Sequence, residues 1–287
     1  MLALAVTAAF GAALCFAGSS VAQHVAASRV PVERVLSPRL LIQLAGNRLW
    51  LLAFPLDAVG IGLQALALRE GTLLVVQPMV AIGLAIAVPI RAAVEHRRPP
   101  RGQWVAVLVC TAALTVLLAE LHPTAGHADI SPGPAAYGFG GVAALTLLLA
   151  MVGRRRPAWA AGTTATGAGL MFGASGVLLK LVATGASEGL GLLGTWPPYV
   201  LVLFGATGLL LSQNAFQAAS LAYPLALLTV VEPVTSIGLA VWLLGERAPV
   251  GPARALVIAA TAAVLLSGLV FLSLRRDPAT RSAGVDH

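Results

Sequence analysis

The stretch "VEPVTSIGLA", residues 231–240, places a glutamate directly before a proline inside an otherwise apolar run. An earlier stretch, "VQPMVAIGLA" at residues 76–85, repeats this order with an amide in place of the carboxylate. Laid over one another without gaps, residues 66–91 and 221–246 are identical at ten of 26 positions, including Ile-Gly-Leu-Ala. A weaker match pairs residues 20–27 with 176–183 and places His24 opposite Lys180. The similarity indicates an internal duplication.

The composition predicts a membrane protein. The chain of 287 residues is 58% hydrophobic and 10% charged, with a mean hydropathy of +0.89, which is far from the composition of soluble domains. About 20 apolar residues in a helix span the hydrocarbon core of a bilayer. Such runs occur at residues 3–27, 48–68, 71–91, 103–121, 134–152, 158–183, 198–219, 223–244 and 254–274. The predicted fold class is all-α, a polytopic bundle of about nine transmembrane helices.

The arginines predict the orientation of this bundle. Fourteen of the eighteen basic residues fall in alternate connections, after the first, third, fifth and ninth runs. Basic residues concentrate in cytoplasmic loops. We therefore expect an integral protein of a bacterial plasma (inner) membrane, with its N-terminus outside and its C-terminus in the cytoplasm. A stretch near Leu40–Gly46 has too few apolar residues to cross, so whether it forms a short tenth membrane segment stays open.

The duplicated helices are predicted to lie in opposite directions. The third run corresponds to the eighth, five crossings later, and an odd number of crossings inverts the second copy. We expect a first four-helix repeat over residues 1–122, a linker helix with its loops over 123–157, and a second repeat with a short tail over 158–287. Inverted repeats with interrupted helices are a recurring plan of secondary transporters. A tandem duplication that serves only stability is the alternative.

The end of the chain resembles a known family. The segment that starts at "TVVEPVTSIGLAVWLLGERAPVG", residues 229–251, is similar to the end of an EamA-type repeat of the drug/metabolite transporter superfamily, with a proline-bearing helix, a Leu-Gly-Glu turn at residues 244–246 and a final Ala/Leu-rich helix. The resemblance implies a secondary transporter, and specifically an exporter, of small organic solutes or metabolites. The first copy lacks the Gly-Glu, and most such proteins have ten helices with both termini inside.

A second resemblance leaves the substrate open. NIPA-like proteins, which are predicted to carry magnesium, share the nine-helix count and have Thr-Pro where this chain has Gln77-Pro78. A transporter of magnesium or another divalent cation is therefore an alternative function. A structural membrane component that transports nothing is an alternative of another class.

Two carboxylates mark the expected transport pathway. Of eleven acidic residues, only Asp57 and Glu232 lie deep within predicted spans. A charge at the centre of a membrane helix costs about 2.5–3.5 kcal/mol on insertion scales, so neither side chain should face lipid. Pro78 and Pro233 each free a backbone carbonyl one turn earlier, which needs a partner, a water or a ligand. Because burial disfavours the ionised form of a carboxylate, we hypothesise that Glu232 exchanges a proton or an ion during transport.

The other polar residues in the spans complete the candidate pathway. Asp57 and Gln64 are seven positions apart and share a helix face, as do Gln213 and Gln217, which are four apart. These amides can line a path or can join helices by hydrogen bonds. The sharpest expectation is that Gln77-Pro78 and Glu232-Pro233 face one another across a central cavity. The full set of candidates is Asp57, Gln64, Gln77, Pro78, Lys180, Gln213, Asn214, Gln217, Glu232 and Pro233.

Several residues are assigned structural roles or none. Gly169 and Gly173 permit close helix packing. Trp50, Trp104, Trp159 and Trp196 fall near predicted helix ends and are interpreted as interfacial anchors. Cys15 and Cys110 lie in separate runs, which predicts neither a disulfide nor a metal site. We predict no enzyme activity, no cofactor and no nucleic-acid partner. The expected partners are the lipid bilayer and a small-molecule or ion substrate, and a homodimer stays open.

Overall fold

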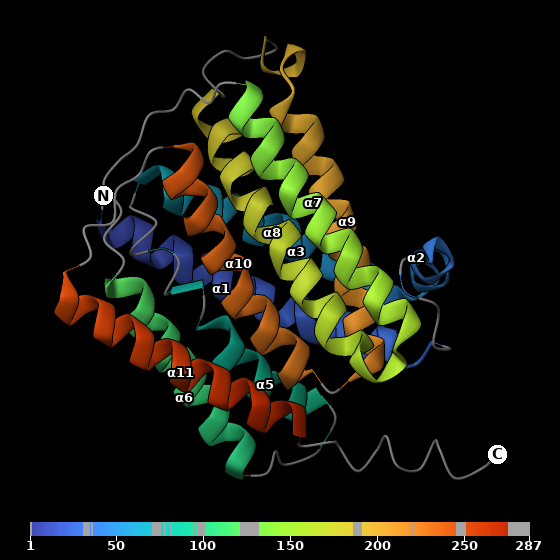
Figure 1. Cartoon of the computed structure of the whole chain (residues 1–287). Helices are drawn as coiled ribbons and strands as arrows, with labels where there is room; N and C mark the ends of the chain where they lie inside the picture. Colours follow the sequence, from blue (N-terminus) through green and yellow to red (C-terminus); the bar gives the residue numbers. More distant parts are fainter. Residues whose placement is uncertain are drawn as a thin grey trace.

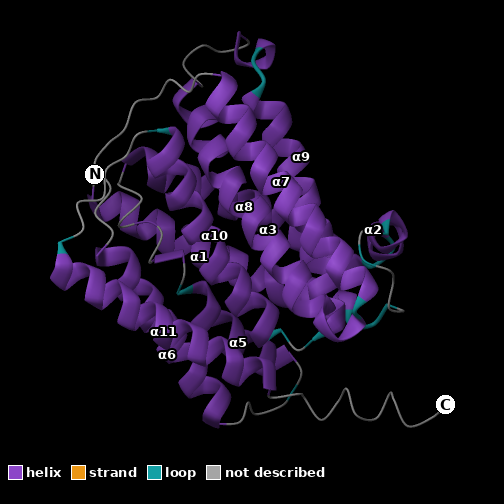
Figure 2. Cartoon of the chain, in the orientation of Figure 1, coloured by secondary structure: helices purple, strands orange, loops and turns teal. Residues whose placement is uncertain are grey.

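The computed structural model describes residues 2–30, 35, 37–70, 76, 79–80, 82–94, 96, 101–120, 132–185, 191–219, 221–244 and 251–274. Throughout these residues the regular structure is helical, and no strand occurs among them (Figure 2). The predicted all-α class is therefore confirmed. The helices are α1 (Leu2–Ala27), α2 (Pro38–Ala45), α3 (Arg48–Glu70), α5 (Gly83–Val94), α6 (Arg101–Glu120), α7 (Pro132–Arg155), η1 (Pro157–Trp159), α8 (Ala160–Gly185), α9 (Pro197–Ala218), α10 (Ala222–Leu243) and α11 (Pro252–Leu274).

Eight of the nine predicted spans each coincide with one long helix, namely α1, α3 and α6 to α11. The predicted span at 71–91 is only partly within the described residues, and its described part is mainly α5. By length and apolar composition, six helices in the described ranges can cross a membrane: α1, α3, α7, α8, α9 and α10. The count of nine spans stays a prediction. The stretch near Leu40–Gly46 forms α2, which has eight residues and is too short to cross.

The helices pack side by side in a bundle (Figure 1). The most extensive packing joins neighbours in the chain, with α1 along α3 and α8 along α9, while α10 lies along α8. Two helices that are far apart in sequence, α6 and α11, also pack along each other at one side of the bundle. Helices α1 and α9, which come from different halves of the chain, are in contact, and so are α5 and α10.

Large apolar side chains cover the outside of the bundle, and small residues fill much of its inside. Large side chains point outward along the helices, including Leu52 (65% exposed), Val202 (71%) and Leu256 (72%). The buried positions are rich in alanine, and buried polar side chains such as Gln23 and Gln213 lie among them. Because lipid tails give helices no hydrophobic reason to associate, membrane helices pack through small residues and buried polar contacts. This distribution is the one that a lipid surround favours.

The α1–α3 and α8–α9 hairpins share one packing detail in which a phenylalanine ring covers a glycine. A Cβ added at Gly60 of α3 would lie 2.7 Å from Cε1 of Phe16 in α1. A Cβ added at Gly208 of α9 would lie 2.8 Å from Cε1 of Phe172 in α8. Each ring therefore sits where only glycine leaves enough room.

A second pair of contacts recurs at the same spacing. Gly11 of α1 faces Leu63 of α3, and Gly167 of α8 faces Leu211 of α9, with the added Cβ 3.1 and 3.3 Å from the leucine Cδ1. The interval from Gly11 to Gly167 equals that from Phe16 to Phe172, and the intervals in α3 and α9 also agree with each other. The two hairpins therefore use the same contacts at corresponding positions.

Helix α10 lies close to α8 at the two glycines that the sequence assigns to packing. A Cβ on Gly169 would lie 2.7 Å from Cβ of Val231, and a Cβ on Gly173 would collide with the carbonyl oxygen of Glu232. The predicted role of these glycines is confirmed. The close approach holds the backbone around Glu232 against α8.

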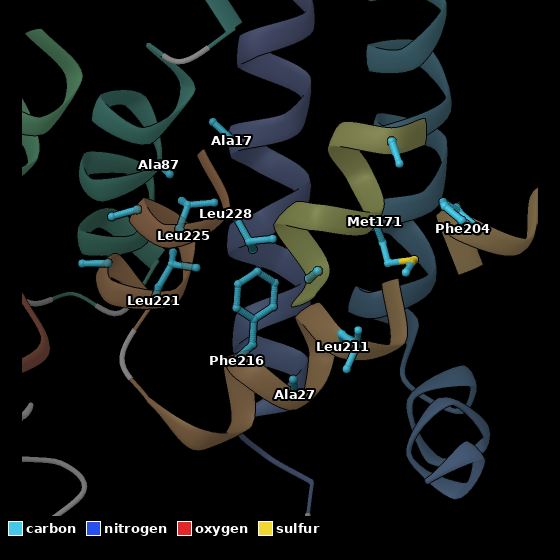
Figure 3. Packing of buried hydrophobic residues seen from close by; sticks show 14 of the residues in the cluster. Ala17, Ala27, Ala87, Met171, Phe204, Leu211, Phe216, Leu221, Leu225 and Leu228 are labelled. Atoms are coloured by element: carbon cyan, nitrogen blue, oxygen red, sulfur yellow. The ribbon is translucent and has the colours of Figure 1, made fainter. Parts of the chain in front are cut away.

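The remaining helices close the bundle and share its core. Helices α6 and α11 are antiparallel, because Glu120 at the end of α6 pairs with Arg254 at the start of α11 over 3.8 Å. The main buried cluster draws on both halves of the chain. In Figure 3, Phe216 of α9 projects into this cluster beside Leu225 and Leu228 of α10, with Ala17 and Ala27 of α1 nearby.

We predict that Gly173→Ala lowers stability by about 1–3 kcal/mol, which is the usual cost of overpacking, because the obstacle is a backbone carbonyl that cannot rotate away. The thermal unfolding midpoint of the purified protein, followed with a dye that reacts with the buried Cys110 thiol, measures the effect. Gly176→Ala is the matched control, since its Cβ would lie 3.4 Å from the Ser236 hydroxyl. Equal midpoints for the two variants would contradict the packing.

Candidate functional site

Asp57 lies on the inner face of α3. The buried positions of this helix recur every three or four residues, at Trp50, Ala53, Gly60, Gln64 and Ala67. Asp57 falls on the same stripe, midway between Ala53 and Gly60, whereas Leu52 and Val59 on the opposite side are more than half exposed. The predicted shared face of Asp57 and Gln64 is confirmed. The carboxylate therefore points toward α1 rather than toward lipid.

The carboxylate of Asp57 is held by a glutamine of α1. Gln23 Nε2 donates to Asp57 Oδ2 over 2.6 Å and to Ser19 Oγ over 2.9 Å. Ser19 and Gln23 are four positions apart on α1, so both face α3. The side chains of Ser19 and Gln23 are buried, at 0% and 6% exposure. A charge within the membrane thus has hydrogen-bond donors from the neighbouring helix.

The same glutamine connects the two halves of the chain. Gln213 Nε2 of α9 donates to Gln23 Oε1 over 2.6 Å, and Trp50 Nε1 of α3 donates to Gln213 Oε1 over 3.1 Å. Gln213 is completely buried. The four side chains Trp50, Gln213, Gln23 and Asp57 form one continuous series of hydrogen bonds, which we call the polar chain.

The interpretation of Trp50 as an interfacial anchor is wrong. Its side chain is 5% exposed, stacks edge-on against Phe54 with ring centroids 4.5 Å apart, and directs its indole N–H to Gln213. A buried indole needs an acceptor for its N–H, and the polar chain provides one. In contrast, Trp159 is 60% exposed, as expected for an anchor.

Further contacts join α1 and α9 beside the polar chain. The His24 ring packs edge-on against Phe216 with centroids 5.9 Å apart. Gln217 Nε2 approaches the Val30 carbonyl oxygen at 3.5 Å, and Asn214 Nδ2 donates to Leu210 in its own helix over 2.7 Å. Within the described ranges, His24 Nδ1 and Asn214 Oδ1 are buried and have no hydrogen-bond partner. Such atoms are candidates for contact with a ligand or water.

Glu232 faces the interior of the bundle from the middle of α10. The outward side of this helix carries Val234 and Trp242, which are 50% and 58% exposed. Glu232 lies on the opposite side, one turn from Leu228 and one turn from Ser236, both of which are buried. The residue as a whole is partly accessible. Its position on α10 directs the carboxyl group inward, away from the lipid-facing side.

The other predicted site residues divide into three groups. Gln64 and Pro233 are buried, which agrees with an inward position. Lys180 is partly exposed near the end of α8. Gln77 and Pro78 lie outside the described residues, so the expected pairing of Gln77-Pro78 with Glu232-Pro233 is not tested.

The structure adds Ser19, Gln23 and Trp50 to the site. Gln23 is a neutral residue in an apolar run. The one feature of the sequence that could have identified it as a site residue is that an amide inside a membrane helix needs a hydrogen-bond partner. Trp50 gives the opposite signal, because a tryptophan near a helix end usually marks the membrane interface. Neither residue type identifies which helix supplies the partner.

The described site residues can bind polar or charged groups. Asp57 and Glu232 carry carboxyl groups that can bind a cationic group when ionised, and the amides of Gln23 and Gln213 can both donate and accept. Among the residues that the structure describes, no three His, Cys, Asp or Glu side chains come together as a metal site would require. The buried polar side chains of α1, α3 and α9 are joined by hydrogen bonds in the polar chain. Glu232 faces inward separately from α10, where its backbone packs against Gly173 of α8.

The long apolar helices, the apolar exterior and the polar interior are together those of an integral membrane protein. No family model matches the chain, and no solved structure matches it. The chain is similar to an uncharacterized protein of Corynebacterium glutamicum, with 28% identity over 250 residues that cover 85% of this chain and 86% of that protein. The similarity thus involves most of the bundle.

We predict that Gln213→Leu destabilises the protein by about 1–3 kcal/mol, because it leaves the Trp50 N–H and the Gln23 oxygen buried without partners. A double-mutant cycle with Gln23→Leu should show that the two losses are not additive. Thr207→Val on the same helix is the control, since the Thr207 hydroxyl is exposed and, among the described residues, donates to the Leu203 carbonyl oxygen within α9. Strict additivity in thermal unfolding would rule out the polar chain.

Proposed function

We propose that this chain is a secondary transporter of small organic solutes that works by alternating access between two inverted four-helix repeats. The observation that supports it best is the repeated packing of the α1–α3 and α8–α9 hairpins, which use matching glycine contacts at constant intervals. The proposal agrees with the resemblance of the chain to the drug/metabolite transporter superfamily. Export of the solute is the direction that this resemblance implies.

The relation between the hairpins favours an inverted repeat. If the segment at 71–94 crosses the membrane once, α8 begins five crossings after α1, so equivalent helices have opposite directions. The packing partners also correspond, since α1 contacts α3 and α5, while α8 contacts α9 and α10. Helices α6 and α11 are then the last helices of the two repeats, and they pack on each other in opposite directions. Two inverted copies of one unit can exchange conformations, which opens the site to each side in turn.

The two inward carboxylates are the proposed substrate and coupling groups. Asp57 is held by hydrogen bonds, whereas Glu232 lies beside Pro233 at a point where α10 lacks one backbone hydrogen bond. Burial makes the ionised form of a carboxyl group costly unless a cation lies beside it. The group therefore holds a proton when no cation is bound and releases the proton when a cationic group arrives. We assign the exchange of a proton or cation to Glu232 for this reason.

The polar chain is proposed to seal the cytoplasmic end of the pathway. Gln23 lies near the end of α1, Trp50 near the start of α3 and Gln213 near the end of α9. With the N-terminus outside, as the arginine distribution predicts, all three of these ends lie toward the cytoplasm. The bonds to Gln213 cross between the repeats, so they have to break when that end opens.

At the opposite end of the bundle, the repeat-related positions carry residue types that cannot form an equivalent seal. By the intervals of the matching glycines, Gln23 corresponds to Leu179, Gln213 to Ala65 and Trp50 to Pro198. None of these residues has a side chain that can form the same hydrogen bonds. We propose that this difference makes the outward-open state the more stable one in the absence of substrate.

The transport proposal predicts that purified protein in proteoliposomes carries organic amines or amino acids and that an imposed pH gradient drives the flux. Glu232→Gln should insert normally and lose the dependence on the pH gradient. Glu120→Gln is the matched control, because Glu120 lies at the end of α6 beside Arg254. Normal pH-dependent flux in Glu232→Gln would contradict the assigned role.

The same assay separates the alternative functions. Magnesium flux without amine flux would favour a divalent-cation carrier. Correctly folded protein that moves neither a broad panel of solutes nor magnesium would favour a structural membrane component.

The seal predicts a change in accessibility that requires no substrate. In a variant without Cys15 and Cys110, Ser19→Cys should react slowly with a membrane-impermeant thiol reagent applied from the cytoplasmic side, because Ser19 is fully buried. Adding Gln213→Leu should raise this rate several-fold, whereas adding Thr207→Val should not. An unchanged cytoplasmic rate with Gln213→Leu, or an equal increase with Thr207→Val, would contradict the seal.

A further inference from the structure

The short helix α2 is apolar on the side that packs on the bundle and also on part of the side that does not. Leu40 and Leu44 are fully buried where α2 contacts α3 and α9. Ile42, on the other side of the helix, is 72% exposed. The apolar arc of α2 runs from Leu40 and Leu44 through Leu41 and Ala45 to Ile42, and is therefore wider than its contact with the bundle. Arg39 and Gln43 occupy the remaining arc.

The axis of α2 is transverse to the axes of the long helices beside it. In Figure 1, α7, α8 and α9 run across the picture, whereas α2 is seen nearly end-on at the side of the bundle. An eight-residue helix is about 12 Å long and cannot span the hydrocarbon core. A helix that lies transverse to membrane-crossing helices lies along the membrane surface. One edge then faces the protein, one faces acyl chains and one faces headgroups.

Exposed arginines lie at this end of the bundle, on and beside α2 and at the end of α7. Arg29, Arg39 and Arg48 are exposed, and so are the consecutive Arg154, Arg155 and Arg156. The two groups are near each other, because Val35, just before α2, lies beside Gly153 at the end of α7, with a Cβ on that glycine 3.7 Å from Val35 Cγ2. Residues 28–48 and 153–160 together contain seven arginines and a single acidic residue, Glu33.

We propose that α2 and these arginines form a binding surface for anionic phospholipids of the adjoining leaflet. Ile42 and Leu41 would contact the acyl chains, and the guanidinium groups of Arg39, Arg48 and Arg155 would bind the lipid phosphates. Arginine matches the geometry of phosphate oxygens and attracts anionic headgroups. Because α2 packs on α3 and α9, which carry Trp50 and Gln213, lipid bound here stabilises the end of the bundle that contains the polar chain.

The test uses the full-length protein purified in a neutral detergent, with thermal unfolding followed at the buried Cys110. Phosphatidylglycerol should raise the unfolding midpoint of the wild-type protein, whereas phosphatidylcholine should not, because a ligand that binds only the folded state stabilises it. Arg48→Gln and Ile42→Ser should each reduce the shift induced by phosphatidylglycerol by about half or more. Both residues are exposed, so neither change should lower the midpoint in detergent alone.

Arg69→Gln is the matched control, because Arg69 is exposed at the opposite end of the same helix, α3. Its lipid-induced shift should equal that of the wild type. An equal loss in Arg69→Gln and Arg48→Gln would mean that lipid acts through overall charge, and would overturn the proposal. A shift of the same size with inorganic phosphate, or one unaffected by Ile42→Ser, would also overturn it, since acyl chains would then have no part. None of these outcomes depends on transport.

Discussion

A lipid surround offers no hydrogen-bond partner, and this constraint explains the main polar feature of the bundle. Gln23, Gln213 and Trp50 each carry an N–H group that would be costly in hydrocarbon, and Asp57 carries a carboxylate that would cost more. The structure satisfies them with one another through bonds of 2.6 to 3.1 Å. Since the bonding groups come from α1, α3 and α9, their mutual satisfaction also fixes how the first half of the chain meets the second.

Close packing of small residues is the second condition for this arrangement. Gly60 and Gly208 accommodate aromatic rings, and Gly169 and Gly173 bring α10 against α8 near Glu232. Membrane helices gain little from hydrophobic burial against one another, so close approach and buried polar bonds supply most of their association. The position of the carboxylate at Glu232 is therefore a consequence of glycines on another helix.

Both kinds of contact relate to the proposed transport cycle. Glycine contacts recur within each half, where they preserve the shape of a hairpin, whereas the bonds to Gln213 occur between the halves. A transporter needs units that stay intact and interfaces that open. Hydrogen bonds suit the interface because water or substrate can replace them when it opens. The anionic-lipid surface on α2 would bias the same interface from outside the pathway.

The sequence by itself determined the helical class and the positions of the long helices, because runs of about 20 apolar residues have one stable form in a bilayer. It also determined that Asp57 and Glu232 face inward, since exposure of either to lipid is costly. It identified Gly169 and Gly173 as packing residues, because small residues in membrane helices have few other roles. Only the tertiary structure decided that Gln23 bridges Asp57 and Gln213, and that Trp50 is buried rather than interfacial. Helix periodicity assigns a residue to a face, but which helix covers that face depends on contacts between segments that are distant in sequence.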